Sequence, residues 1–413
     1  GSANDPGGVL LVADTNFSHK RGYYTSAFDV TISTDTPGAT IRYTTDGTLP
    51  TLSNGSTYST PISITTTTVL RTRAYKTGQQ ETDVDTQSYI FPVDVASQTK
   101  PAGYPNNWGN NDYEVDTSIS QSGTYSTRFQ TGLRSVPTVS LVGNPLDFFG
   151  PSGIWVNTGN RNLEAPVSAE YFQPDPLTDG VNTLNGFQID CGAKLQGGAS
   201  RNPGSAVKHS MSMRFRDTYG EGKLNFPVFE DNKVTTFDSL HLRAMYNNSW
   251  VHSSSSQRAR ATMIRDQWAR SSMIDMGNLD GGHGHYAHVY INGLYWGLYN
   301  LHERLENDHY AAHNGYEDDE VLGRNPGSAT SEENASYNQM IGVATSNSST
   351  WTQIKAVIDV ENYIDYVITE YFGRNADLKS NDNWRCAGGG TANAPWRFYC
   401  WDTERIFEGE TNT

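Results

Sequence analysis

The stretch YFGRNADLKSNDNWRCAGGGTANAPWRFYCWDTERIF, residues 371–407, joins the end of an apolar-striped segment to a strongly aromatic one. Its last part, residues 396–407, is rich in aromatic residues, which are typical of strands. In alternating strand geometry, Asp402 and Glu404 would share one face. Two carboxylates on one face are one way to hold a divalent cation. The simpler alternative is that both acids are solvated residues at the end of a strand.

The segment before this aromatic strand predicts a long helix. Residues 359–373 read DVENYIDYVITEYFG, and Gly373 suits the position after a helix end. Polar residues follow, which either cap the helix exit, their commoner use, or offer oxygen ligands. The apolar stripe consists of Val360, Tyr363, Ile364, Val367, Ile368, Tyr371 and Phe372, and the polar residues after it are Asp377, Asn381, Asp382 and Asn383.

A glycine-rich hairpin is predicted further upstream. Residues 186–198 and 208–217 alternate as strands, and the turn between them carries Ser200 and Arg201, with Lys208 opening the second strand. Oxygen ligands, a lysine and an arginine are the parts of a phosphoryl-transfer site. Each residue taken alone is more often a surface charge or a turn residue.

Two further elements are predicted between these segments. Residues 253–277 have a serine-rich start, helical spacing and a glycine end, so they predict a helix. Residues 285–303 predict a hairpin with Asn292 and Gly293 at its turn. The region from residue 136 onward is therefore a mixture of helices and strands.

Charge and hydropathy exclude two classes of partner. The 413 residues contain 30 Lys and Arg against 45 Asp and Glu, a formal net charge of −15. Such a chain repels phosphate backbones, so no nucleic-acid partner is expected. No run of about 18 apolar residues is present, so no membrane span is expected. The abundance of Ser, Thr, Gly, Asn and Tyr is typical of extracellular proteins.

The chain has three cysteines. Cys386 and Cys400 flank the glycine-rich turn, and we predict a disulfide between them, with Cys191 left single. The alternative is three reduced, buried thiols. No CxxC motif or clustered Cys/His spacing stands out, so no zinc site is expected.

The N-terminal region, residues 1–93, predicts an all-β module. Residues 28–33 alternate as a half-buried strand, and residues 37–51, PGATIRYTTDGTLPT, continue with a turn at Asp46 and Gly47. With Tyr58, Pro61, Ile62 and the closing SYIF, this module resembles the C-terminal β-sandwich of chitobiases and β-hexosaminidases, an Fn3-like accessory module. Residues 94–135 are rich in Pro, Gly, Asn and Ser and predict a structured linker.

Residues 136–413 resemble the spore-coat protein H (CotH) kinase-like family. The motifs that carry the resemblance are GGASR, KHSMSMRFRDTYG, LHLRA, MIRDQWAR, YINGLYWGLYNLHER, YFGRNADLKSNDNW and WRFYCWDTER. The predicted fold class is therefore multidomain, an N-terminal all-β sandwich followed by an α+β atypical kinase-like domain. Relatives continue with further helices, so the chain is expected to be C-terminally truncated relative to them.

The resemblance implies a secreted or cell-surface kinase that uses ATP and Mg²⁺. Asp377 would be the catalytic acid/base, and Asn383 and Asp402 would bind Mg²⁺. Glu404 would give a second metal contact, although many relatives have Asp there. Six positions separate Asp377 from Asn383, whereas protein kinases place the Asn five after the catalytic Asp.

The same resemblance implies a nucleotide-binding set. Lys208 would contact the ATP phosphates, assisted by Arg201 and Ser200 of the glycine-rich turn. Glu303, in the hairpin motif, would orient the nucleotide or that lysine.

Two functions remain open from the sequence. The first is an extracellular kinase acting on a protein or glycan acceptor at the cell surface. The second is a catalytically idle surface protein that binds carbohydrate or the cell envelope. A glycosidase is discounted, because no pair of acids on a barrel scaffold accompanies the N-terminal module.

Overall fold

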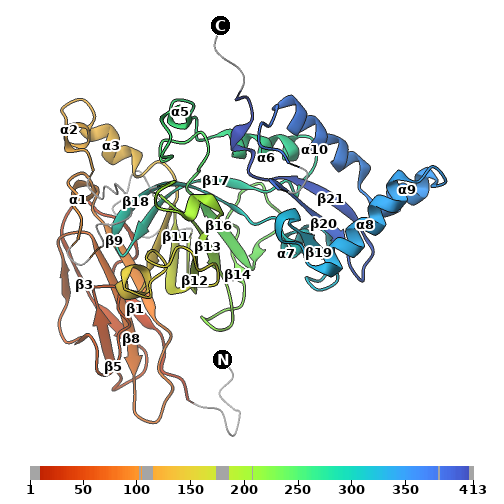
Figure 1. Ribbon diagram of the computed structural model, residues 1–413. Helices are drawn as coiled ribbons and strands as arrows, with labels where there is room; N and C mark the ends of the chain where they lie inside the picture. The colour runs from red at the N-terminus through yellow and green to blue at the C-terminus, as the bar shows by residue number, and fades with distance from the viewer. Residues whose placement is uncertain are drawn as a thin grey trace. The chain divides into compact units, whose positions relative to one another are not determined.

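The computed structural model describes residues 10–101, 104, 115–173, 186–206, 208–379 and 382–408 (Figure 1). The chain divides into two compact units. The first comprises Gly1–Leu195, Asp217–Glu221 and Tyr286–Tyr299, and the second comprises Gln196–Arg216, Gly222–His285 and Asn300–Thr413.

The N-terminal part of the first unit is all β, as the sequence predicts. One sheet has the strand order β2-β9-β8-β5-β6, and β1 pairs with β4 and β3 with β7. Buried apolar residues from these strands, such as Val30, Ile64 and Leu70, form one core, so the module is a β-sandwich. The strands are β1 (Thr15–Phe17), β2 (Gly22–Tyr23), β3 (Phe28–Val30), β4 (Ile32–Thr34), β5 (Thr40–Thr44), β6 (Ser56–Thr57), β7 (Ile62–Ile64), β8 (Thr68–Tyr75) and β9 (Asp85–Ile90).

The rest of the first unit is a second sheet with short helices. β10 (Thr138–Val142), β11 (Ala165–Phe172) and β12 (Gly186–Gln196) are antiparallel neighbours, and β17 (Gly284–Ile291) runs parallel to β10. The helices are α1 (Pro92–Val95), α2 (Thr117–Ser120), α3 (Ser126–Gly132) and α4 (Pro145–Phe149).

Glu170 of β11 ties the sandwich to this second sheet within the first unit. Its buried carboxylate lies 3.1 Å from Nε of Arg21 and accepts hydrogen bonds from the backbone and hydroxyl of Ser88. Burial raises the pKa of Glu170, and these partners oppose that rise.

The domain boundaries at residues 93 and 135 stay predictions.

The predicted hairpin is confirmed. β17 and β18 (Leu294–Glu303) are joined by Asn292 and Gly293, which have positive φ values of 48° and 80°. Both residues tolerate that conformation, and it matches the twist of the flanking strands. The turn belongs to the first unit, and the strand end at Glu303 belongs to the second.

The described residues of the second unit contain three groups of paired strands. β13 and the end of β18 flank β16, and β19-β20-β21 form an antiparallel sheet. β14 pairs with β15. The strands are β13 (Ser210–Arg214), β14 (Leu224–Asn225), β15 (Thr236–Phe237), β16 (Ser239–Arg243), β19 (Leu322–Arg324), β20 (Trp384–Gly389) and β21 (Ala394–Cys400).

Helices surround the β19-β20-β21 sheet in the blue part of Figure 1. Trp396, Phe398 and Cys400 of β21 are buried in one core with residues from α6, α8 and α10. The helices of this unit are α5 (Ser255–Arg258), α6 (Arg265–Asp275), α7 (Asn307–Asn314), α8 (Ser331–Thr345), α9 (Trp351–Val357) and α10 (Val360–Phe372), with short 3₁₀ turns η1 (Ala199–Arg201), η2 (Pro326–Ser328) and η3 (Thr403–Arg405).

The long predicted helix is confirmed as α10, but its buried face is not the apolar stripe. Asn362 and Tyr366 face β21, where Asn362 accepts from the backbone of Phe398 at 2.6 Å. Ile368 is 51% exposed and Tyr371 76% exposed. Packing on the sheet therefore selects a different side of the helix from the one that hydropathy indicates.

Two local predictions are wrong. The single helix over 253–277 is broken into α5 and α6, with Met263 between them at a φ of 62°. Cys386 and Cys400 are buried thiols without a disulfide. The register pairs Cys386 with Phe398 and Cys400 with Trp384, so the two cysteines do not face each other across the hairpin. Their thiols therefore give no support for an oxidising compartment.

Candidate functional site

The acids after β21 do not continue the strand. β21 ends at Cys400, and Asp402 adopts a left-handed conformation with a φ of 57° before the turn η3. Asp and Asn are the non-glycine residues that tolerate this region best. The expectation that Asp402 and Glu404 share a strand face is therefore wrong.

Arg243 nevertheless brings the two acids together. Its guanidinium donates from Nη2 to Oδ1 of Asp402 and from Nε to Oε1 of Glu404, the latter at 2.9 Å. The backbone N–H groups of Tyr246 and Asn247 also donate to Glu404, at 3.1 and 2.7 Å. Glu404 is thus enclosed, whereas the side chain of Asp402 is 38% exposed.

A third acid, Asp266, completes this cluster. It lies 3.0 Å from Arg270 and 3.9 Å from Arg243, and its Oδ1 accepts from the backbone of Thr403. Burial alone would raise the pKa of Asp266, but the two arginines lower it well below its usual value. The pKa of Glu404 is raised, because its burial outweighs Arg243 and two acids lie nearby. Two arginines thus face three carboxylates.

Asp377 and Asn383 come from the loop between α10 and β20. Nδ2 of Asn383 donates to the backbone oxygen of Asp377 at 2.8 Å. The carboxylate of Asp377 lies 3.1 Å from Nζ of Lys379 and 3.8 Å from Arg405.

Backbone contacts place this loop beside the segment of Asp402. The N–H of Ala376 donates to the oxygen of Arg405, and Trp384, which follows Asn383, pairs with Cys400. Asp377, Asn383 and Asp402 therefore lie on adjoining segments at one end of the β20–β21 pair. Asn381 lies outside the described residues.

The glycine-rich turn contains the predicted cationic residues. Arg201 in η1 is buried and donates to the oxygen of Gly197 at 2.7 Å. The backbone oxygen of Ser200 lies 2.8 Å from Nδ1 of His209. Lys208 precedes β13, the neighbour of the strand that ends at Arg243, and burial lowers the pKa of Lys208 to about 7.

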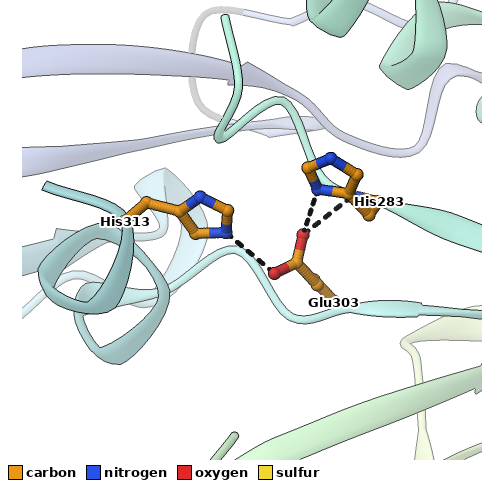
Figure 2. Close-up of side chains that lie close together, drawn as sticks. All are labelled: His283, Glu303 and His313. Carbon is orange, nitrogen blue, oxygen red and sulfur yellow. Dashed lines mark hydrogen bonds and ion pairs between the residues drawn. The ribbon is translucent and has the colours of Figure 1, made fainter. Parts of the chain in front are cut away.

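Glu303 has a different set of neighbours from the one that the sequence predicts. Its Oε2 accepts from the backbone of His283 at 2.8 Å and lies 3.0 Å from Nδ1 of that ring. Its Oε1 lies 2.9 Å from Nε2 of His313 and accepts from Asn232 at 2.8 Å. Figure 2 shows both rings turned toward the carboxylate. Burial would raise the pKa of Glu303, but the histidines, His309 foremost, lower it well below its usual value.

This histidine cluster could hold a metal ion, since one ligand atom each from His283, Glu303 and His313 lie within 4.8 Å of one another. A search for CxxC motifs and clustered Cys/His spacing does not detect this cluster, but the sequence carries one signal for it. HYAAH, residues 309–313, puts two histidines four positions apart, on one face of a helix. No comparable signal in the sequence indicates that His283 and Glu303, at the two ends of a hairpin, join this cluster.

Comparison with known protein families finds two matches, one in each part of the chain. A family model described as CotH kinase protein matches residues 205–413, just over half of the chain, so the chain belongs to that family. A model of the chitobiase/beta-hexosaminidase C-terminal domain matches residues 19–86, inside the sandwich. No curated protein matches the chain. Within the part of the chain that the structure describes, no helix has the length and hydropathy needed to cross a membrane.

Proposed function

We propose that the protein is an extracellular kinase that uses ATP and Mg²⁺ to phosphorylate a protein or glycan at the cell surface. One observation carries the proposal. In a chain of the CotH kinase family, three separate residues that suit phosphoryl transfer, Asp377, Asn383 and Asp402, lie on adjoining segments. The extracellular location is supported by the chitobiase-type module.

The oxygen donors of this site suit Mg²⁺. Asp402 has a partly exposed carboxylate, and Asn383, on the adjoining segment, would add an amide oxygen. ATP would supply the phosphoryl group, and Mg²⁺ bound with it would supply positive charge that stabilises the transfer. Asp377 would accept the proton of the acceptor hydroxyl, while Lys379 and Arg405 hold its carboxylate in position.

The glycine-rich turn would provide the phosphate contacts. Lys208 and Arg201 bring positive charge, and Ser200 brings a hydroxyl. Burial lowers the pKa of Lys208 to about 7, so just above neutral pH more than half of the protein molecules carry a neutral Lys208. A bound phosphate would restore the charge, so nucleotide binding should take up a proton at pH 8. We leave Glu303 out of this proposed set, because its carboxylate contacts His283 and His313.

A specific observation favours the second candidate, a catalytically idle surface protein. Arg243 already bonds to both Asp402 and Glu404, which places a permanent cation where a kinase would hold its metal. Under this alternative the site is a structural ion cluster, and the β-sandwich is the functional part of the chain.

Calorimetry and a phosphoryl-transfer assay would separate the two candidates. The kinase proposal expects the wild-type chain to bind ATP in the presence of Mg²⁺. Asp402→Asn should abolish that binding, and Asp377→Asn should keep it while lowering transfer by about 10²–10⁴-fold. Asp275→Asn, an exposed acid at the end of α6, is the matched control and should behave as wild type. A wild-type chain that binds no Mg²⁺–ATP would overturn the kinase proposal.

A further inference from the structure

We infer that His283, Glu303 and His313 form a site for a transition-metal ion of the zinc type, distinct from the acids around Asp402. The nitrogens of His283 and His313 lie 3.0 and 2.9 Å from the two oxygens of Glu303 (Figure 2). Tetrahedral zinc has bonds of about 2.0–2.2 Å, which places its ligand atoms roughly 3.3 Å apart. These two separations join different oxygens of Glu303, and one ligand atom from each of the three residues lies within 4.8 Å of the others, so shifts of the side chains would bring them to this spacing around one ion. Two histidines with one glutamate are a known zinc ligand set.

The register of the strands separates this site from the kinase-like one. Glu303 is opposite Leu240 on β16, whereas Arg243, which bonds to Asp402, is opposite Asn300. Three residues along a strand span about 10 Å. The two sites therefore occupy different ends of the same strand pair and can be tested independently.

His309 provides a further nitrogen at the same carboxylate. Its Nε2 lies 2.8 Å from the backbone oxygen of Asp280, which can only accept, so Nε2 carries the proton. Its Nδ1 lies 3.5 Å from Oε1 of Glu303. A histidine whose other nitrogen donates to a carbonyl is also the usual arrangement around a bound metal.

The ligand chemistry favours zinc over magnesium. Imidazole nitrogens suit Zn²⁺ and its neighbours in the transition series, whereas Mg²⁺ prefers oxygen ligands. All three side chains are enclosed, with His283 7% and His313 6% exposed. An ion held here would link the start of β17, the end of β18 and α7, so its role would be structural.

A small pocket offers access to the cluster. Its volume is about 20 Å³, enough for roughly one water molecule, and its wall includes Glu303 and His309. Asp238 and Asp308 also line it and would attract a cation. Burial, together with nearby acids, raises the pKa of Asp308 to about 6, so its carboxylate is ionised at neutral pH.

The alternative is a metal-free network in which the histidines donate to Glu303. Metal analysis of the purified full chain and titration of the chelator-treated chain with Co²⁺ and Zn²⁺ distinguish the two. The proposal expects one metal ion per chain and a visible Co²⁺ spectrum of tetrahedral type. His283→Gln and His313→Gln should each weaken Co²⁺ binding by at least about 10-fold. His19→Gln, a histidine of the β-sandwich, and Asp402→Asn should leave it unchanged.

A folding defect in the glutamine variants would not obscure the result. His313→Cys replaces one zinc ligand by another, so this variant should bind Co²⁺ and add a sulfur-to-cobalt band to the spectrum. The absence of stoichiometric metal binding by the wild-type chain would overturn the proposal. So would unaltered Co²⁺ affinity in both glutamine variants. Neither result bears on ATP binding at Asp402.

Discussion

Two buried acids of the second unit, Glu404 and Glu303, are neutralised in opposite ways. Glu404 is bound by Arg243 and by backbone N–H groups, whereas Glu303 is surrounded by histidines and Asn232. An arginine keeps its charge at every accessible pH and has no lone pair to offer a metal. A neutral histidine can coordinate a metal. The same residue type, buried to a similar degree, thus belongs to a permanent ion cluster in one place and to a potential metal site in the other.

The largest stability effect should come from removing the permanent cation. Arg243→Met leaves Asp266, Asp402 and Glu404 without their shared partner, and breaking a buried ion pair typically costs about 3–5 kcal/mol. Urea unfolding measures the loss. Arg260→Met, which removes an exposed arginine 3.6 Å from Glu408, is the matched control and should cost less than about 1 kcal/mol. If Arg243→Met lowered the free energy of unfolding no more than Arg260→Met does, Arg243 would not be needed to neutralise the acids.

A smaller effect is expected at the second acid. Glu303→Gln keeps the shape but removes the charge from several hydrogen bonds, so we expect a loss of about 1.5–3 kcal/mol in metal-free protein. Glu332→Gln, at an exposed position in the first turn of α8, is the control. In wild-type protein, added Zn²⁺ should raise the melting temperature, and in Glu303→Gln this rise should shrink. A full Zn²⁺ response in the variant would remove Glu303 from the proposed ligand set.

The pH dependence of stability provides a test at Lys208, a half-buried cation. The pKa of Lys208 is lowered by burial from 10.5 to about 7 in the folded chain. Between these two values the unfolded chain binds more protons, so the contribution of Lys208 makes stability rise with pH from about 7 to 10.5. Lys208→Met should remove this rise and stabilise the chain at pH 7. Melting temperatures across that range, with Lys233→Met as an exposed control, measure it. Identical slopes for wild type and Lys208→Met would contradict the burial of the charge.

The smallest effect should be found on the helix that supports the sheet near the ion cluster. Ile368 of α10 is 51% exposed, and Ile368→Ser should change stability by no more than about 0.5 kcal/mol. Chemical denaturation gives the value. A loss above about 1.5 kcal/mol would show that the apolar stripe of α10 is packed in solution.

The sequence by itself determined the features that depend on short spacing. The alternating strands of the β-sandwich, the Asn292-Gly293 turn and the existence of α10 all follow from backbone preferences within a few residues. The two family assignments also come from motifs that lie within single segments, and both are confirmed.

Only the tertiary structure decided which segments meet. The left-handed Asp402, the buried face of α10 and the register that keeps Cys386 from Cys400 depend on neighbours far along the chain. Arg243 reaches Glu404 across 161 positions. Glu303 meets His283 because the β17–β18 hairpin closes. It meets His313 because α7 follows the end of β18 after a short turn. The free energy of such encounters comes from packing and desolvation of the whole unit, and local sequence patterns do not record it.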